Sequence, residues 1–124
     1  MTRAELRELA AHPGHAIGAH GAHHLLLPEQ PLAAAIQEVL EGKAAVEAAL
    51  GRPVTAFAYP YGGHDATAVE VVRAARFDVA VTTDARPVHA ADDPLRLPRL
   101  DLSRLDPEAF GARLEAAVGV PKRP

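Results

Sequence analysis

Three of the seven histidines lie within five residues of one another, at His20, His23 and His24. His20 and His24 are four residues apart, and in a helical turn or a tight loop this separation lets two imidazoles reach one divalent ion. Neutral imidazole suits Zn, Co, Ni or Fe better than Mg or Ca. The segment 16–20 is predicted to be a short buried strand, and sites in parallel α/β folds form where strands end. Surface loops also carry histidines, so the spacing by itself is weak evidence.

The other histidines are expected to lie outside such a site or at its margin. Adjacent residues rarely face one ion together, so His23 is expected to point away. His64 follows a Gly-Gly turn near the same predicted edge and could join the site, although an exposed loop position is the simpler expectation. His12 and His15 flank the end of a helix and are expected in solvent, and His89 has no evident role.

A second candidate group is the turn that contains Tyr59, Pro60 and Tyr61. Pro60 fixes the backbone and Gly62 permits an unusual φ, so the turn can aim a backbone N–H or a tyrosine hydroxyl at a substrate. Tyrosine rings also stack well on sugar rings. Three of the chain's five Phe and Tyr residues lie between Phe57 and Tyr61. The alternative is a strand-end turn with core aromatics, which needs no further context.

The acidic residues give no convincing pair for general acid–base chemistry. Asp65 and Asp106 are explained as helix caps, and the pair 92–93 is explained by the turn before a proline. Asp84, at a predicted strand end, is the least explained. There is no Gly-rich phosphate loop, and the single serine, Ser103, has no nucleophile elbow around it.

The composition is that of an ordinary globular domain, with 48% hydrophobic and 23% charged residues and a net charge of −3. Nucleic acid is not expected as a partner, because Lys122-Arg123 is the one basic cluster and is too short. The absence of cysteine excludes disulfides and thiolate zinc sites. No apolar run approaches the roughly 20 residues of a membrane span, and the charged N-terminus has no signal region. The chain as it stands therefore predicts a cytoplasmic location, while that of any longer parent stays open.

Predicted strands and helices alternate along the chain. Thr2 and Glu5 have the spacing of a capping box, and the helix they begin is stopped by Pro13-Gly14. Strands are predicted at 16–20, 54–59, 79–83 and 95–102, and further helices at 32–50, at 65–75 and from 106 onward. This alternation predicts parallel βα units in an α/β fold. Four strands are few for a closed barrel, so the sheet is either a small open one or part of a larger barrel.

The two candidate groups occur in a familiar order. The segment 17–24, a long helix, the segment 56–62, Val81-Thr82-Thr83 and the segment 95–100 together resemble polysaccharide deacetylases of the NodB-homology type, carbohydrate esterases of family four. The resemblance extends from about Leu6 to Leu102. It implies a distorted (β/α) barrel, and the fold expected here is a partial (β/α) barrel of the deacetylase type that lacks the first strands. Residues 1–124 are expected to form one such partial domain.

The resemblance also implies a function and site residues. Members of the family remove N- or O-acetyl groups from polysaccharides with a divalent metal held by one Asp and two His. The two histidines map onto His20 and His24, and the expected metal is Zn, or otherwise Co or Ni. A backbone N–H at Tyr61 matches the family's oxyanion contact, and Tyr59, Pro60 and Tyr61 are the expected substrate-binding residues. An acetylated polysaccharide or oligosaccharide is the expected partner.

Several family features are missing. The family's first motif supplies two aspartates, the general base and the third metal ligand, but only 19 residues precede His20 and none is Asp. Gly21 stands where the family has Ser or Thr, and Ala58 stands where it has Arg. No Trp is present, and no histidine lies around Leu97. We expect that the chain begins inside a longer domain.

Three functional hypotheses stay open. The chain is a deacetylase or a weakly active or inactive portion of one, a non-catalytic carbohydrate-binding or interaction module on the same fold, or one half of a split enzyme. An incomplete barrel would leave the strand edge near Ile17 unpaired. We therefore expect a homodimer, a complex with a complementary N-terminal fragment, or a marginally stable protein.

Overall fold

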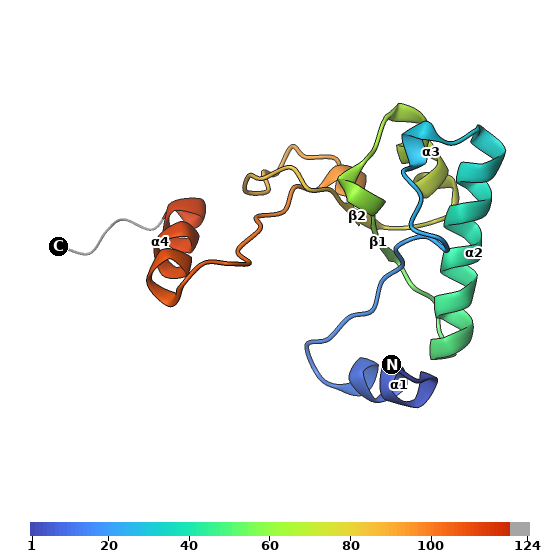
Figure 1. The fold of residues 1–124 in the computed structure, drawn as a ribbon, viewed down its shortest axis with the longest axis horizontal. Helices are drawn as coiled ribbons and strands as arrows, with labels where there is room; N and C mark the ends of the chain where they lie inside the picture. Colours follow the sequence, from blue (N-terminus) through green and yellow to red (C-terminus); the bar gives the residue numbers. More distant parts are fainter. Residues whose placement is uncertain (120–124) are drawn as a thin grey trace.

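Helices and strands alternate in the structure as the sequence predicts. The computed structural model describes residues 1–119, so Lys122 and Arg123 lie outside the described residues. The helices are α1 (Arg3–Ala11), α2 (Leu32–Leu50), α3 (Ala66–Ala74) and α4 (Pro107–Val118), and the strands are β1 (Ala56–Ala58) and β2 (Val79–Val81) (Figure 1). Single 3₁₀ turns occupy Leu27–Glu29, Pro60–Gly62 and Pro94–Arg96. Within the described residues, no helix has both the length and the apolar character that a membrane span requires.

The sheet is parallel, and its members pair in chain order. Strand β1 pairs with β2, and Phe57 lies opposite Ala80. On the other side of β1, Ala19 forms a parallel bridge with Phe57, and on the far side of β2, Leu97 forms one with Val81. Four segments thus lie side by side in the order in which the chain visits them. The sheet is not closed, which confirms the predicted partial (β/α) barrel.

The strand predicted at 16–20 forms at one residue only. The amide of Ala19 donates to Ala56 O (2.9 Å), and Ala19 O accepts from the amide of Ala58 (2.9 Å). Of residues 16–20 only Ala19 is buried. Just beyond, Gly21 adopts a φ of +78°, which no extended strand allows. The prediction of a continuous buried strand was therefore wrong.

The prediction of a fourth strand at 95–102 was also wrong, because this segment pairs with the sheet through a single bridge at Leu97. The Asp93 carboxylate accepts from the amide of Leu95 (2.9 Å) and caps a 3₁₀ turn that begins at Pro94. Leu97 alone pairs with the sheet, through Ala80 O and the amide of Thr82. The next carbonyl that a ladder would use, Thr82 O, instead accepts from Arg99 Nε (2.7 Å).

The helix ends confirm the predictions from capping residues. Thr2 and Glu5 form the reciprocal capping box of α1, and α2 keeps the predicted bounds and ends at Gly51, whose φ is +76°. The Asp65 carboxylate accepts from the amide of Ala68 at the start of α3 (2.7 Å), and Asp106 caps α4 in the same way. Local sequence therefore determines where these helices begin and end.

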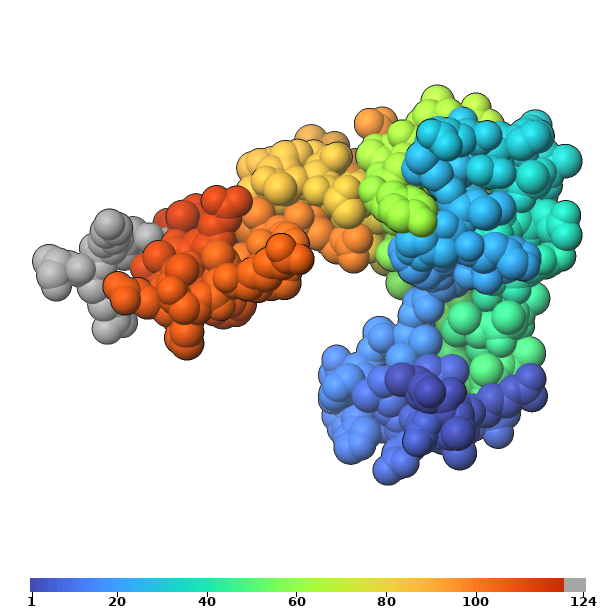
Figure 2. Space-filling view, in the orientation of Figure 1, coloured from blue at the N-terminus to red at the C-terminus, as the bar shows by residue number. Residues whose placement is uncertain are grey.

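The core lies between the sheet and the pair α2 and α3. Val39 and Val72 from the helices meet Phe57 and Ala80 from the strands, and all four are buried. Tyr59 is fully buried and its hydroxyl donates to Leu95 O (2.9 Å). Helix α1 lies at the end of α2, and α4 lies away from the core, next to the loop 85–87 and Leu100 (Figures 1 and 2).

One contact brings α2 unusually close to the loop that follows Ala19. A Cβ added to Gly42 of α2 would lie 2.7 Å from Gly21 O and 2.8 Å from the amide nitrogen of Ala22. Both neighbours are backbone, so neither can rotate away. Only glycine at position 42 permits this approach.

Gly42→Ala is expected to destabilise the fold by about 1–3 kcal/mol, the usual cost of overpacking. Gly111→Ala is the matched control, because Gly111 lies in α4 with no atom within 4 Å of the added Cβ. There the helix propensity of alanine should add about 0.5–1 kcal/mol. Urea denaturation followed by circular dichroism measures both changes. Equal shifts of the same sign would contradict the close approach.

A second prediction concerns pH. Burial, with a smaller contribution from the charge of Asp93, raises the pKa of Tyr59 to about 12. In the unfolded chain the pKa is about 10. The neutral form therefore stabilises the fold below pH ~10, and this contribution is lost as the pH rises from ~10 to ~12. In Tyr61→Phe, Tyr59 is the only tyrosine, so absorbance at 295 nm should rise near pH 12 or on unfolding. A step near pH 10 in folded protein would contradict this.

Candidate metal and acyl-binding site

The ring of His20 is held by the end of β1. Its Nδ1 lies 2.7 Å from Ala58 O. A carbonyl oxygen can only accept, so Nδ1 carries the hydrogen and Nε2 keeps a free lone pair. Metal-binding histidines are commonly oriented by such a bond from the other ring nitrogen. The strand that positions His20 thus leaves Nε2 free to coordinate a metal.

His24 lies between His20 and Tyr61. Its ring makes an edge contact with the His20 ring, with centroids 4.7 Å apart, and another with the Tyr61 ring at 4.5 Å. All three side chains are exposed. The structure therefore brings together the predicted ligand pair and the predicted turn, which are almost forty residues apart in the sequence.

The donor set fits a divalent metal in kind, although it is small. Two imidazole nitrogens suit Zn, Co or Ni. Among residues 1–119, no group of three or more His, Asp or Glu side chains is placed to hold one ion. His64 does not complete the pair: its Nδ1 lies 2.9 Å from Gly62 O and its ring packs near Tyr59. A metal held by His20 and His24 would keep open coordination positions.

The turn after β1 is strained at its centre. Tyr61 has a φ of +57°, which is uncommon for a residue with a side chain, and Gly62 follows at +71°. Gly62 lies against the side chain of Thr83, which leaves no room for a Cβ. In the described part of the chain the amides of Gly62 and Gly63 donate within the turn, whereas no hydrogen bond uses the amide of Tyr61. The turn therefore presents a free backbone donor beside the histidine pair.

The three residues expected to bind substrate differ in exposure. Tyr61 is 68% exposed. Tyr59 and Pro60 are buried. The hydroxyl of Tyr59 is used on Leu95 O, which gives it a place in the core. Substrate contacts by Tyr59 and Pro60 stay a prediction, and Tyr61 alone offers a surface for them.

A buried carboxylate on α2 holds the loop 22–25, which we call the histidine loop. Glu38 of α2 is only 2% exposed, and its Oε1 accepts from the amides of His23 (2.7 Å) and Leu25 (3.3 Å). Its Oε2 lies 3.0 Å from His23 Nδ1. His23 thus turns toward α2, away from the pair, as expected. Sequence analysis did not identify Glu38. The sequence feature that could have identified it is its spacing: Glu38 shares one face of α2 with the small residues Ala35 and Gly42.

The charge state of Glu38 follows from these contacts. Burial alone would raise the pKa of Glu38, but the hydrogen bonds from the amide and ring of His23 and from the amide of Leu25 outweigh it. The net effect lowers the pKa of Glu38, so the carboxylate is ionised at neutral pH. His23 Nδ1 must then be the donor in the contact between the two side chains.

Glu38 also explains why position 21 lacks the expected Ser or Thr. A Cβ on Gly21 would lie 2.6 Å from Glu38 Oε1, and the φ of +78° already disfavours any residue but glycine. The Glu38 carboxylate fills the space that a side chain at position 21 would occupy. No structural feature explains Ala58 in place of the expected arginine, since His20 uses only its carbonyl.

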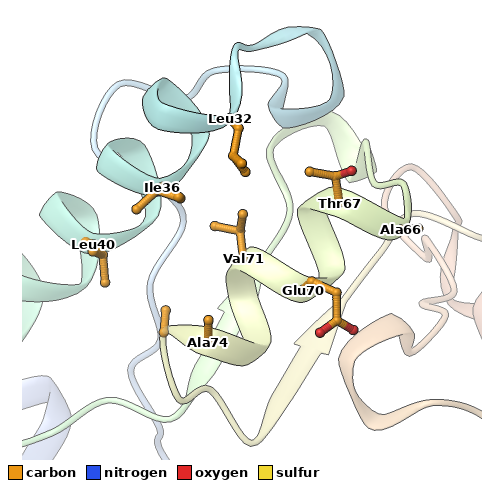
Figure 3. Close-up of a pocket in the computed structure, with 9 residues that line it drawn as sticks. Leu32, Ile36, Leu40, Ala66, Thr67, Glu70, Val71 and Ala74 are labelled. Atoms are coloured by element: carbon orange, nitrogen blue, oxygen red, sulfur yellow. The ribbon is translucent and has the colours of Figure 1, made fainter.

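Several cavities among the described residues lie outside the histidine pair, and two of them are of interest here. A pocket of about 390 Å³ is lined by Thr83, Arg99, Leu100 and Asp101. It neighbours the turn, because Thr83 also lies against Gly62. The larger groove, about 560 Å³, runs between α2 and α3 on a different face, where Leu32, Ile36 and Val71 point into it (Figure 3). Its lining offers only Thr67 and Glu70 as polar side chains, so it has no evident chemistry.

Solved structures similar to this chain share its fold. The Streptococcus pyogenes deacetylase PplD in complex with acetate matches with a TM-score of 0.83 and 23% identity, over 93% of this chain and 51% of that one. BC0361, a polysaccharide deacetylase from Bacillus cereus, matches with a TM-score of 0.77 and 22% identity over 92% and 36%. IcaB from Ammonifex degensii matches with a TM-score of 0.74 and 23% identity over 92% and 51%. The chain thus spans about half or less of their lengths.

Sequence comparison identifies the family. A search among curated proteins found no match. The family model described as polysaccharide deacetylase matches residues 1–80, a region that contains the histidine loop, Glu38 and the Tyr61 turn. This match covers more than half of the chain and agrees with the fold shared with the solved deacetylases. The chain belongs to the polysaccharide deacetylase family.

Proposed function

We propose that this chain supplies the metal-binding histidines and the acyl-binding turn of a metal-dependent polysaccharide deacetylase. The reaction is hydrolysis of N- or O-acetyl groups on a polysaccharide, with Zn, or otherwise Co or Ni, as the metal. The observation that carries the proposal is the row of His20, His24 and Tyr61, which joins the ligand pair to a free backbone donor. The PplD structure contains acetate, which is also the product of acetyl hydrolysis.

The roles of the residues follow from their geometry. A metal bound by His20 and His24 would supply Lewis acidity toward the acetyl carbonyl and its attacking water. Ala58 O fixes the His20 tautomer, so the lone pair of Nε2 would be the metal ligand. The amide of Tyr61 would donate to the carbonyl oxygen as negative charge develops on it. Attack by water followed by departure of the amine or alcohol gives acetate and the deacetylated sugar.

Two chemical requirements are not met within the described residues. A third metal ligand and a general base would both be carboxylates, and in residues 1–119 none joins the histidine pair. We propose that these groups come from a second chain or a complementary segment placed along the open sheet edge at Ala19. The absence of such carboxylates beside the pair in residues 1–119 also favours an alternative function. In this alternative the chain is a carbohydrate-binding or interaction module that keeps the fold without the catalysis.

Divalent-metal binding through His20 and His24 is expected to be weak, because two ligands leave most of the coordination sphere to water. Calorimetric titration of Zn²⁺ or Co²⁺ into the full chain measures it. His20→Ala and His24→Ala should each lower the affinity about 10-fold or more. His89→Ala is the matched control and should bind like the wild type, since His89 lies in an exposed loop. Unchanged binding by the double variant His20→Ala/His24→Ala would remove the assignment.

The chain alone is expected to release little or no acetate from an acetylated chito-oligosaccharide. A general base contributes roughly 10²–10⁴-fold, and the missing metal ligand adds to that loss. Acetate is measured with and without Zn²⁺ or Co²⁺, and the double histidine variant is the control. Turnover at about 1–10³ s⁻¹, the range of ordinary enzymes, would show that the described residues already contain the base. Oligosaccharide binding without acetate release would favour the binding-module alternative.

A further inference from the structure

We propose that Glu38 is a positioning residue for the histidine pair: its buried carboxylate holds the loop 22–25 on α2 and so sets the orientation of His24 relative to His20. The inference rests on the proposed role of the two histidines as metal ligands. It adds a residue that touches neither the metal nor the substrate and lies on another element.

The first observation concerns the two backbone amides on either side of His24. The amides of His23 and Leu25, on either side of His24, both donate to Glu38 Oε1. Two amides that flank one residue converge on a single acceptor when that residue takes the left-handed conformation, the geometry of an anion-binding nest. His24 has a φ of +61°, an uncommon conformation that needs support from its surroundings. The carboxylate therefore stabilises the backbone shape that aims the His24 ring at His20.

The start of the loop is held by the same residue. The amide of Ala22 donates to the main-chain carbonyl of Glu38 (3.2 Å). Gly21 lies between Glu38 Oε1 and the backbone at Gly42, with no space for a Cβ. Three amides between His20 and Leu25 thus end on one residue of a long helix. Because α2 is rigid, the loop receives a fixed position relative to the strand that holds His20.

Stability alone does not account for this arrangement. A buried charge gains little net stability over an apolar residue of similar volume, even when it is fully hydrogen-bonded. In some proteins such a buried polar group instead specifies one conformation. The conformation specified here is that of the loop that carries the candidate ligands. The functional consequence of removing Glu38 should therefore exceed its effect on folding.

The first test uses the whole 124-residue chain without metal and nuclear magnetic resonance. Glu38→Leu keeps volume without an acceptor, whereas Glu38→Gln keeps an oxygen for the amides of His23 and Leu25. In Glu38→Leu the ring-to-ring Overhauser contact between His20 and His24 and the exchange protection of those amides should be lost. In Glu38→Gln the ring contact and the amide protection should both remain. The His23 ring should change from the Nδ1–H to the Nε2–H tautomer, because the side-chain NH₂ of Gln would donate to His23 Nδ1. Val72→Ala, a core change in α3, controls for general destabilisation.

The second test measures Co²⁺ affinity by the visible absorption of the bound ion. Glu38→Leu should bind about 10–100-fold more weakly than wild type, the usual loss on removing a group that orients a ligand. Glu38→Gln should retain most of the affinity, and so should Val72→Ala while it stays folded. If Glu38→Leu does not fold, Glu38→Gln and the tautomer change of His23 still test the contacts between residue 38 and the loop 22–25.

The outcomes separate the two proposals. Unchanged amide protection and an unchanged His20–His24 contact in Glu38→Leu would overturn the positioning role. An equal loss of both in Val72→Ala would also overturn it, since the effect would then reflect stability. A wild-type chain that binds no Co²⁺, yet loses the ring contact in Glu38→Leu, would refute the metal site and leave the positioning role supported.

Discussion

Helix α2 approaches the histidine loop so closely that backbone packs on backbone at Gly42 and Gly21. Neither partner can retreat, because α2 is anchored in the core through Val39 and the loop is tied to β1 through Ala19. The approach places Glu38 beneath the loop, and it requires glycine at both contact positions. The loop conformation, the buried carboxylate and the missing side chain at position 21 are consequences of this one packing constraint.

The candidate site is therefore assembled from three directions. The end of β1 fixes His20 through Ala58 O, α2 fixes the loop around His24, and the following turn brings Tyr61 against His24. The first two supports act on a ring nitrogen and on backbone, and the third is a contact between rings. Exposed side chains carried by packed elements in this way are typical of sites at the carboxyl ends of parallel strands.

Much of this organisation could be predicted from the sequence where the determinants are local. Capping residues at Thr2, Asp65 and Asp106 predicted where helices begin, and the order of motifs indicated the family and the partial barrel. Strand lengths could not be predicted, because they depend on neighbours: the segment at Ala19 pairs at one residue, and Arg99 takes the carbonyl that a longer fourth strand would need.

Within the site, the reasons for the remaining differences are similarly non-local. Histidine spacing identified a pair that does come together, and the turn residue Tyr61 joins it. Buried Tyr59 is tied by its hydroxyl to Leu95 O, more than thirty residues later in the chain. The burial of Glu38 could not be predicted, because a glutamate on a helix is ordinarily solvated. Only the close approach of the loop gives its carboxylate hydrogen-bond partners.

Pairing in chain order also has a consequence for how the molecule opens locally. Strand β1, β2 and the Leu97 segment make a continuous unit in which each segment pairs with the next one along the chain. The histidine segment pairs with the sheet at Ala19 alone, and its other contacts are made by side chains and by α2. Local opening of the loop 22–25 would separate the two imidazoles. A metal ion that bound both imidazoles would oppose that opening and so stabilise the folded chain.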